Sequence, residues 1–394
     1  MKTQTGYKKV ARLIPIFLIL ICGVCLIFFL HQKNSPVVET LGEGGTIKWV
    51  DFNIPYETLC KAYEVDIATY KEEKHIDWVE LLAYIAAKTG GNFKGSMEKE
   101  IDKIVEKVQT EDTTIAEEGK ELRYYDYYYQ AYSAVLSAYV GEYKIQTQNE
   151  NGEMVWEERY GLKAFSPIAK GFEYNDYDDF GSSRSYGYKR LHLGHDMMGQ
   201  IGTPIIAVES GTVEAIGWNQ YGGWRIGIRS FDKKRYYYYA HLRQNYPYAE
   251  GLEIGSTVTA GDVIGYMGHT GYSTTENVNN IKVTHLHFGI ELIFDEERRA
   301  AGNEIWIDCY QLARFLYKNR SEVEKVGDTR EWKRKYMMEE EQTGETQIEE
   351  QPEQKREQEN REQENQEQEA QGQESQEQEN REQENQEQEA QGQE

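Results

Sequence analysis

The chain has 394 residues and a formal net charge of −24, with 68 acidic against 44 basic residues. This length allows two domains. The basic residues are scattered, which argues against an interface with the phosphate backbone of nucleic acid. There are four cysteines, two of them in an apolar N-terminal segment. The other two, Cys60 and Cys309, define no disulfide framework, and whether they pair is left open.

Residues 13–30 form an uncharged and almost wholly apolar stretch, which is near the minimum length for spanning a bilayer. Four basic residues precede the stretch and one lysine follows it closely, so the positive-inside rule predicts that residues 1–12 are cytoplasmic. A cleaved signal peptide is the alternative, but the stretch ends in bulky residues without a small-residue cleavage site. We therefore predict a transmembrane signal anchor, a single-pass location in the cell membrane and an extracytoplasmic C-terminal part.

Apolar residues at helical spacing predict a small helical domain over residues 49–145, after a linker at residues 31–48 that contains one proline and three glycines. An all-tyrosine stripe can bind glycans, but a helix packed by amphipathic rings is the interpretation we adopt. Nothing in this domain specifies a chemistry. The stripes are formed by Trp78, Leu81, Leu82 and Ile85, then Ile101, Ile104, Val105 and Val108, then Tyr125, Tyr128, Tyr129, Tyr132, Val135, Leu136 and Tyr139.

Three short clusters further along the chain contain five residues of the types that bind zinc when sulfur is absent. His192 and Asp196 lie in Leu-His-Leu-Gly-His-Asp, His241 lies in Tyr-Ala-His-Leu, and His285 and His287 lie in Thr-His-Leu-His-Phe-Gly. If the last run is a strand, alternation places His285 and His287 on one face, opposite a buried apolar face. Each cluster alone fits ordinary histidines, but their conjunction indicates a metal-dependent hydrolase.

In this order the clusters resemble those of the lysostaphin/LytM-type zinc metallopeptidases, family M23. The glycine-punctuated segments 202–213 and 255–271 are similar to the hairpins of that fold. The resemblance covers roughly residues 160–310, and we expect a mainly antiparallel β peptidase domain at residues 160–320. A short extension at residues 274–283 departs from the family pattern, which leaves the substrate preference open.

The resemblance implies that His192, Asp196 and His287 bind Zn²⁺ and that His241 and His285 are catalytic. A neutral imidazole near the metal can take a proton from water at working pH. We assign His285 as the general base, and His241 as the group that stabilises the oxyanion or holds the water. This division of roles is a hypothesis. The remaining histidines, including His195 inside the first cluster, receive no role, and about half of the tyrosines at 236–239 should be core residues.

From residue 339 to 394 the chain is a Gln/Glu-rich segment, in which 21 glutamates face four basic residues. Residues 361–374 recur identically at 381–394. This segment carries most of the chain's negative charge, so the overall acidity does not describe the surface of the predicted site. Such a composition cannot bury enough apolar area to fold, and we expect a disordered tail.

Taken together, the expected fold class is α+β: a transmembrane helix, a helical domain, a β peptidase domain and a disordered tail. The resemblance implies a zinc metalloendopeptidase that hydrolyses peptide cross-links of bacterial peptidoglycan at the outer face of the membrane. An alternative is a LytM-like scaffold or activator in wall remodelling or sporulation without its own catalysis. A protease directed at proteins is a third candidate. The bond that is cut, the time of action and the oligomeric state are not predicted.

Overall fold

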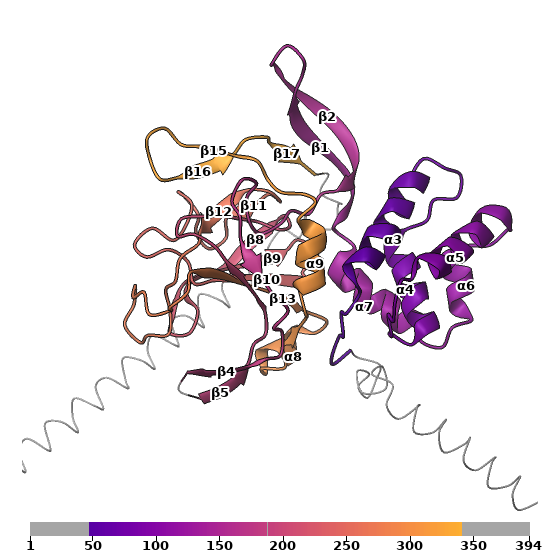
Figure 1. The fold of residues 1–394 in the computed structure, drawn as a ribbon, viewed down its shortest axis with the longest axis horizontal. Helices are drawn as coiled ribbons and strands as arrows, with labels where there is room; N and C mark the ends of the chain where they lie inside the picture. The colour runs from indigo at the N-terminus through magenta and orange to yellow at the C-terminus, as the bar shows by residue number, and fades with distance from the viewer. Residues whose placement is uncertain (1–46, 187, 341–394) are drawn as a thin grey trace, which may run out of the picture. The chain divides into compact units, whose positions relative to one another are not determined.

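The computed structural model describes residues 47–186 and 188–340, which belong to one compact unit (Figure 1). A mainly antiparallel β domain accompanied by several helices confirms the central part of the expected α+β class. The predicted membrane span at residues 13–30 and nearly all of the predicted acidic tail lie outside the described residues.

Five helices make up the first part of the described chain, and their ends follow local sequence signals. The Asp77 side chain accepts hydrogen bonds from the backbone N–H groups of Val79 and Glu80, and Gly90 ends the same helix at a φ of 64°. Thr114 and Glu117 form a reciprocal capping box. The helices are α3 (Tyr56–Thr69), α4 (Trp78–Thr89), α5 (Glu98–Thr110), α6 (Ile115–Lys120) and α7 (Tyr125–Leu136).

The tyrosine stripe of α7 serves packing, as the simpler of the two interpretations expects. Tyr125, Tyr128 and Tyr132 are buried in the same cluster as the apolar face of α4, whereas Tyr129 is 41% exposed. Tyr132 contacts Phe52 edge to face, with ring centroids 5.6 Å apart. The predicted helical domain extends too far in one respect, because residues 140–145 belong to a strand.

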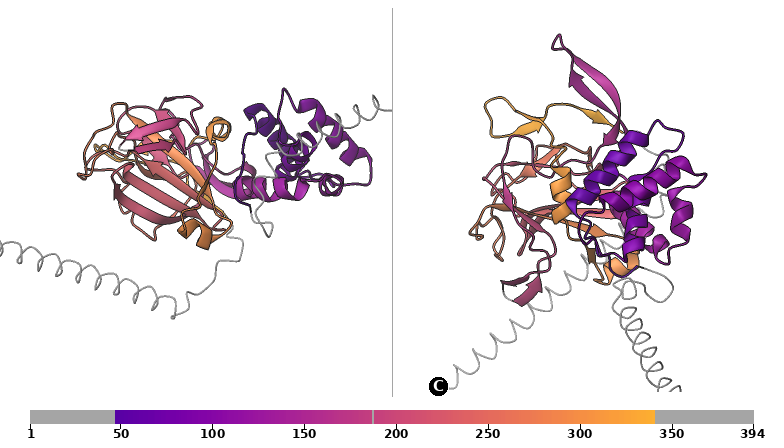
Figure 2. Two further views of the ribbon diagram at one scale, coloured as in Figure 1. Left: turned by 90° about the horizontal axis from the view of Figure 1, so that it is seen from below. Right: turned by 45° about the vertical axis from the view of Figure 1, so that its right-hand side comes forward.

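The central sheet contains eight antiparallel strands in the order β11-β8-β9-β10-β13-β6-β3, with β14 pairing with β13 beside this path. Figure 2 shows these strands side by side in its left-hand view. The strands are β3 (Asn175–Asp176), β6 (His195–Met198), β8 (Gly211–Asn219), β9 (Gly223–Ser230), β10 (Arg235–Ala240), β11 (Thr257–Val258), β13 (His285–Leu292) and β14 (Ile305–Trp306).

Smaller sheets and two short helices surround this sheet. Strand β17 pairs with β1, so Glu339, the first residue of the predicted tail, is ordered against the start of the β domain. The small sheets are β1 (Val140–Gln148) with β2 (Met154–Leu162) and β17 (Met338–Glu339), β4 (Ser183–Tyr186) with β5 (Tyr188–Leu191), β7 (Pro204–Ile206) with β12 (Val263–Tyr266), and β15 (Val323–Lys325) with β16 (Trp332–Arg334); the helices are α8 (Glu296–Ala300) and α9 (Tyr310–Leu316).

Strict alternation divides the central sheet into a core face and a groove face. On β13, Phe288 and Ile290 are at most 1% exposed, and on β10 Tyr237 and Tyr239 are fully buried beside them. The intervening residues point to the other face, where Ala240 of β10 pairs with His287 of β13. As the alternation of the sequence predicts, the tyrosines at 236–239 are therefore divided between the two faces.

A buried guanidinium on the core face connects the β domain to α7. Arg235 of β10 is fully buried and donates to both carboxylate oxygens of Glu209, at 2.7 and 3.0 Å. Its Nη1 atom donates to the backbone oxygen of Ala134 at 2.7 Å. Pairing and full hydrogen bonding are the conditions under which a protein tolerates a buried charge.

The prediction of a single-pass location in the cell membrane is contradicted. Within residues 47–186 and 188–340, no helix is long and apolar enough to cross a membrane. The longest, α3, has 14 residues, whereas a spanning helix needs about 20. Cys60 and Cys309 are both buried and free, so the described part of the chain does not pair them.

Candidate metal centre and groove

The candidate site occupies one end of a cavity of about 420 Å³ on the groove face of the central sheet. The predicted ligands and the predicted catalytic histidines all line this cavity. Strands β6 and β13 position three of them, because Asp196 pairs with His287 and His285 pairs with Met198. His192 comes from the loop that follows β5, and His241 follows the last residue of β10.

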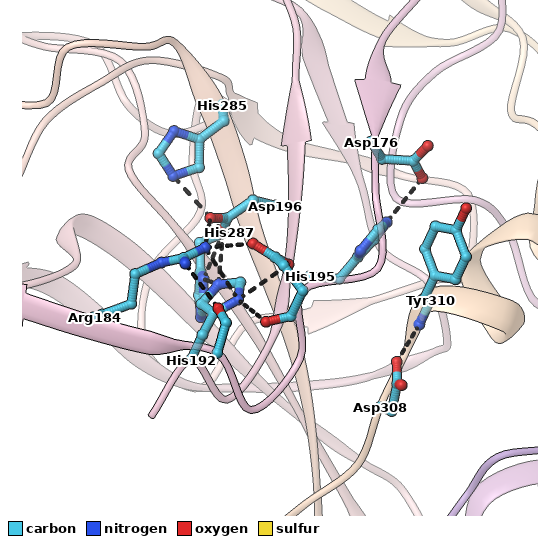
Figure 3. A network of polar contacts seen from close by, with 11 residues as sticks. Asp176, Arg184, His192, His195, Asp196, His285, His287, Asp308 and Tyr310 are labelled. Carbon is cyan, nitrogen blue, oxygen red and sulfur yellow. Dashed lines mark hydrogen bonds and ion pairs between the residues drawn. The ribbon is translucent and has the colours of Figure 1, made fainter. Parts of the chain in front are cut away.

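Three ligand atoms converge at the centre of the cluster (Figure 3). Asp196 Oδ1 lies 3.0 Å from His192 Nε2 and 2.9 Å from His287 Nδ1, and the two nitrogens are 3.0 Å apart. A tetrahedral zinc ion with ligand bonds of about 2.0–2.1 Å spaces its ligand atoms by about 3.3 Å. The donor types and their spacing therefore fit zinc with little movement, and these three residues could hold a metal ion.

The electrostatics of the cluster favour a bound cation. Burial opposes ionisation of Asp196, but hydrogen bonds from His192 and His287 outweigh it and hold the pKa of the carboxyl well below its usual range. Burial lowers the pKa of His287, and burial together with the neighbouring histidines lowers the pKa of His241 well below its usual value. Burial also acts to lower the pKa of His192, but Asp196 and Asp179 outweigh it and raise that pKa. A charged carboxylate and neutral imidazoles are the forms that bind metal ions.

His192 is supported from behind by two residues that the sequence patterns did not reveal. Its Nδ1 atom donates to the backbone oxygen of Asp179 at 3.3 Å. The buried Asp179 carboxylate, which forms an ion pair with Arg184, lies 3.1 Å from the same nitrogen. Arg184, on strand β4, donates to Asp196 Oδ2 at 3.3 Å as well. A carboxylate behind a ligand histidine fixes its tautomer and raises its basicity. Their positions outside any short motif explain why spacing did not identify them.

The two predicted catalytic histidines lie beside the cluster, with rings 4.7 Å apart. His241 Nδ1 donates to the backbone oxygen of Thr270 at 2.9 Å, and His285 Nδ1 donates to that of Val283 at 2.8 Å. In the neutral ring this leaves each Nε2 atom as an acceptor. His285 Nε2 lies 3.7 Å from Asp196 Oδ1. His241 has a φ of 63°, and such strained backbone is concentrated at functional sites.

His195, which the sequence leaves without a role, lies on the core face. It pairs with Phe288, is 2% exposed and contacts Asp176 of β3 at 2.9 Å. Its ring packs edge to face against Tyr310 of α9 (Figure 3). The structure therefore separates His195 from the metal cluster.

The extension at residues 274–283 packs against the start of β9 and the loop that follows β10. Trp224 Nε1 donates to the Asn277 side chain at 2.9 Å, and Gln244 donates to the Asn277 backbone oxygen at 2.6 Å. The neighbouring Tyr272 reaches the cavity and accepts a hydrogen bond from Arg190 at 2.8 Å. The departure from the family pattern thus lies beside one wall of the groove.

Comparison with known proteins agrees with this geometry. Residues 190–304 match the model of peptidase family M23. An L-Ala–D-Glu endopeptidase of Bacillus subtilis (strain 168) is 37% identical over 130 residues, which cover 33% of this chain and 38% of the relative. The glycyl-glycine endopeptidase ALE-1 of Staphylococcus capitis is 36% identical over 98 residues, or 25% of this chain and 24% of the relative.

A solved structure of a candidate glycyl-glycine endopeptidase lytM from Ruminococcus gnavus is 26% identical, with a TM-score of 0.42; the comparison covers 67% of this chain and 87% of that one. This chain spans well under half the length of either curated relative. The match to the family model contains the three candidate ligands and both predicted catalytic histidines. Residues 190–304 are therefore similar to the peptidase domain of family M23.

Proposed function

We propose that the protein is a zinc-dependent endopeptidase that hydrolyses peptide bonds of peptidoglycan. The observation that carries this proposal is the convergence of His192 Nε2, Asp196 Oδ1 and His287 Nδ1 beside two imidazoles whose Nε2 atoms are acceptors. When bound to these three side chains, zinc supplies Lewis acidity to the scissile carbonyl and to the attacking water.

The two remaining histidines, His241 and His285, position and deprotonate the attacking water. The Nε2 atom of His285 takes its proton, because its Nδ1 atom is already committed to the Val283 carbonyl. His241 faces the same space with an acceptor Nε2, so it holds the water in place. This contact favours the water-holding role among the two roles considered for His241, since stabilising an oxyanion needs a donor.

The substrate class follows from the relatives. Their names specify an L-Ala–D-Glu bond and a glycyl-glycine bond, which differ in the residues beside the bond. Both are peptide bonds, and we infer peptidoglycan peptides as the substrate because M23 relatives act on this polymer. The groove suits an extended peptide, since it is open at the sheet surface and lined by aromatic and polar side chains.

The test uses the full chain, loaded with zinc and dialysed. We expect about one zinc ion per chain, a stoichiometry estimated from one three-ligand site, and new amino termini in purified peptidoglycan. The His192→Ala variant should lose zinc and digestion together, whereas His285→Ala should keep zinc and lose digestion. His269→Ala is the matched control, because this histidine bonds to the Ile281 carbonyl away from the metal cluster.

Each outcome decides between the candidate functions. Bound zinc with new peptide termini that His285→Ala abolishes supports the endopeptidase. Binding of wall polymer without zinc and without new termini would overturn the proposal in favour of a scaffold. Digestion of casein at rates above those for peptidoglycan would instead indicate a protease directed at proteins.

A further inference from the structure

Two arginines on the groove face lack a balancing carboxylate among the described residues. Arg190, near the end of β5, and Arg225, on β9, both line the cavity. The other two arginines of the cavity, Arg184 and Arg299, each form ion pairs with at least two carboxylates. Of these four arginines, only Arg190 and Arg225 therefore have a positive charge that is available for a ligand.

Both of these arginines also have a donor atom without a partner. Arg190 Nη1 and Arg225 Nε are shielded from solvent, and neither makes a hydrogen bond. A buried donor without a partner costs about 1–3 kcal/mol, and more when it is charged. Such atoms are rare in native proteins and need an explanation. At the wall of a cavity, an incoming acceptor would satisfy both.

Arg190 is held in place before any ligand arrives. Its guanidinium lies over the rings of Tyr221 and Tyr272, at 4.9 and 5.1 Å from their centroids. Its Nη2 atom donates to the Tyr272 hydroxyl at 2.8 Å. The two tyrosines come from the loops that follow β8 and β12, which meet where the Tyr272 N–H group donates to the Tyr221 carbonyl at 3.4 Å, so these loops together fix the direction of the guanidinium. Binding would therefore lose little side-chain entropy.

Arg225 lies on the same row of the sheet as the metal cluster. Strand β10 pairs Ala240 with His287 and Tyr239 with Ile226, the residue after Arg225. Two strand spacings, about 10 Å, therefore separate the backbones of Arg225 and His287. A residue of extended peptide advances about 3.3 Å, and an arginine side chain covers much of the remaining distance. Arg225 can thus reach a residue beside the bond at the metal.

The acidic residues of the cavity do not cancel these two charges. Glu291 and Asp196 are engaged by Arg299 and Arg184, whereas Glu304 accepts a hydrogen bond from the neutral Trp306 Nε1 at 2.6 Å and keeps its charge. Tyr238 also lines the cavity, and burial raises the pKa of its hydroxyl although the charges of Arg225 and Arg190 act to lower it. Four arginines and three carboxylates line the cavity, so the lining keeps a small positive excess in a chain whose net charge is −24.

We propose that Arg190 and Arg225 bind a carboxylate on a substrate residue next to the bond that is cut. The substrate is then an acidic peptide, such as a stem peptide with a glutamate, and not a neutral oligoglycine. A carboxylate offers two oxygens to guanidinium donors in charge-assisted bonds, which are about twice as strong as neutral ones. This inference rests on the proposed function and adds the chemistry of the residue beside the bond.

The test compares three peptides on the zinc-loaded full chain: L-Ala-γ-D-Glu-L-Lys-D-Ala, the same peptide with the glutamate carboxylate amidated, and pentaglycine. The acid and the amide differ by a single charged group of nearly equal size. We expect kcat/KM for the acid to exceed that for the amide by about tenfold to a hundredfold, the range for a hydrogen bond to a charged group. Pentaglycine should be the poorest substrate.

In the variants Arg190→Gln and Arg225→Gln, the ratio of kcat/KM for the acid to kcat/KM for the amide should fall toward one. Arg330→Gln, which removes an exposed charge away from the cavity, should leave the ratio unchanged. Binding of the acid and the amide to the metal-free chain, measured by calorimetry, gives a second readout that needs no hydrolysis. The same order, acid tighter than amide, is expected there.

The possible results separate this inference from the proposed function. Digestion of peptidoglycan with equal preference for acid and amide, or with pentaglycine as the best substrate, would overturn the inference alone. A preference that survives in both arginine variants would also overturn it. If peptidoglycan and all three peptides stay intact, the proposed function fails and the inference fails with it.

Discussion

His192 and His195 lie three positions apart in the sequence, and each contacts an aspartate, yet they lie on opposite sides of the central sheet. His192 meets Asp179 and faces the groove, whereas His195 meets Asp176 and faces the core. A histidine–carboxylate pair is therefore no indication of a metal ligand by itself. What distinguishes His192 is that its second ring nitrogen meets Asp196 and His287. The metal site is therefore identified by the three ligand atoms that converge, and a single histidine–aspartate pair does not identify it.

Exchanging each histidine for alanine gives the largest expected contrast. His192→Ala should lose zinc and lower kcat/KM by about a thousandfold or more, because the Lewis acid contributes several kcal/mol. His195→Ala should keep zinc and activity per folded molecule while lowering the free energy of unfolding. Metal analysis, kinetics and thermal unfolding measure these effects. Loss of zinc from both variants would contradict the separation of His195 from the metal cluster.

His285→Ala tests the chemistry of the groove face without removing a ligand. We expect kcat/KM to fall by about 10²–10⁴, the usual contribution of a general base, while zinc content stays at the wild-type level. Simultaneous loss of zinc would instead make His285 a ligand. The backbone carbonyls of Thr270 and Val283 hold the rings of His241 and His285 in the same way. The His241→Ala variant can therefore be compared directly with His285→Ala.

The two faces of the sheet should respond differently to truncation. Ile290→Ala, on the core face and fully buried, should lower the free energy of unfolding by about 2–5 kcal/mol. Tyr238→Phe, on the groove face, removes only a hydroxyl and should cost at most about 0.5–1.5 kcal/mol, the worth of one hydrogen bond. Urea unfolding of both variants measures the difference. Equal losses would contradict the division between stability and chemistry.

The smallest effect is expected from the aspartates behind the two histidines. Asp179→Asn should weaken zinc affinity or activity by about 10–100-fold, because it removes the carboxylate that orients His192. Asp176→Asn is the matched control, and it should leave zinc affinity unchanged, since its partner His195 does not reach the cluster. Competition with a chelator gives both affinities. An equal loss in the two variants would contradict the assignment.

The sequence predicts those parts of this molecule that depend on local alternation. The run around His285 and His287 is a strand with both histidines on one face, and the tyrosines at 236–239 divide between the faces as period two requires. The order of the motifs predicts a resemblance to family M23, and residues 190–304 match the model of that family. The assignments of zinc ligands and catalytic roles remain predictions.

The sequence does not predict features that arise from contacts between distant segments. Asp179 and Arg184 support the cluster from a hairpin that has no motif, and Arg190 and Arg225 become a pair only when β5 and β9 line one cavity. Residues 140–145 form a strand because β2 and β17 pair with β1 on both sides, which local helical spacing cannot reveal.

Because Arg235 bonds to α7, the part of the chain that folds together extends beyond residues 190–304, the part that matches the family model. The match begins at residue 190, yet Arg235 depends on a carbonyl of α7, at Ala134, for one of its hydrogen bonds. A fragment cut at the family boundary would keep this guanidinium buried with one donor unmet, or open the core to hydrate it. We therefore expect the helices and the sheet to unfold in one cooperative transition, and residues 190–304 to depend on α7 for part of their stability.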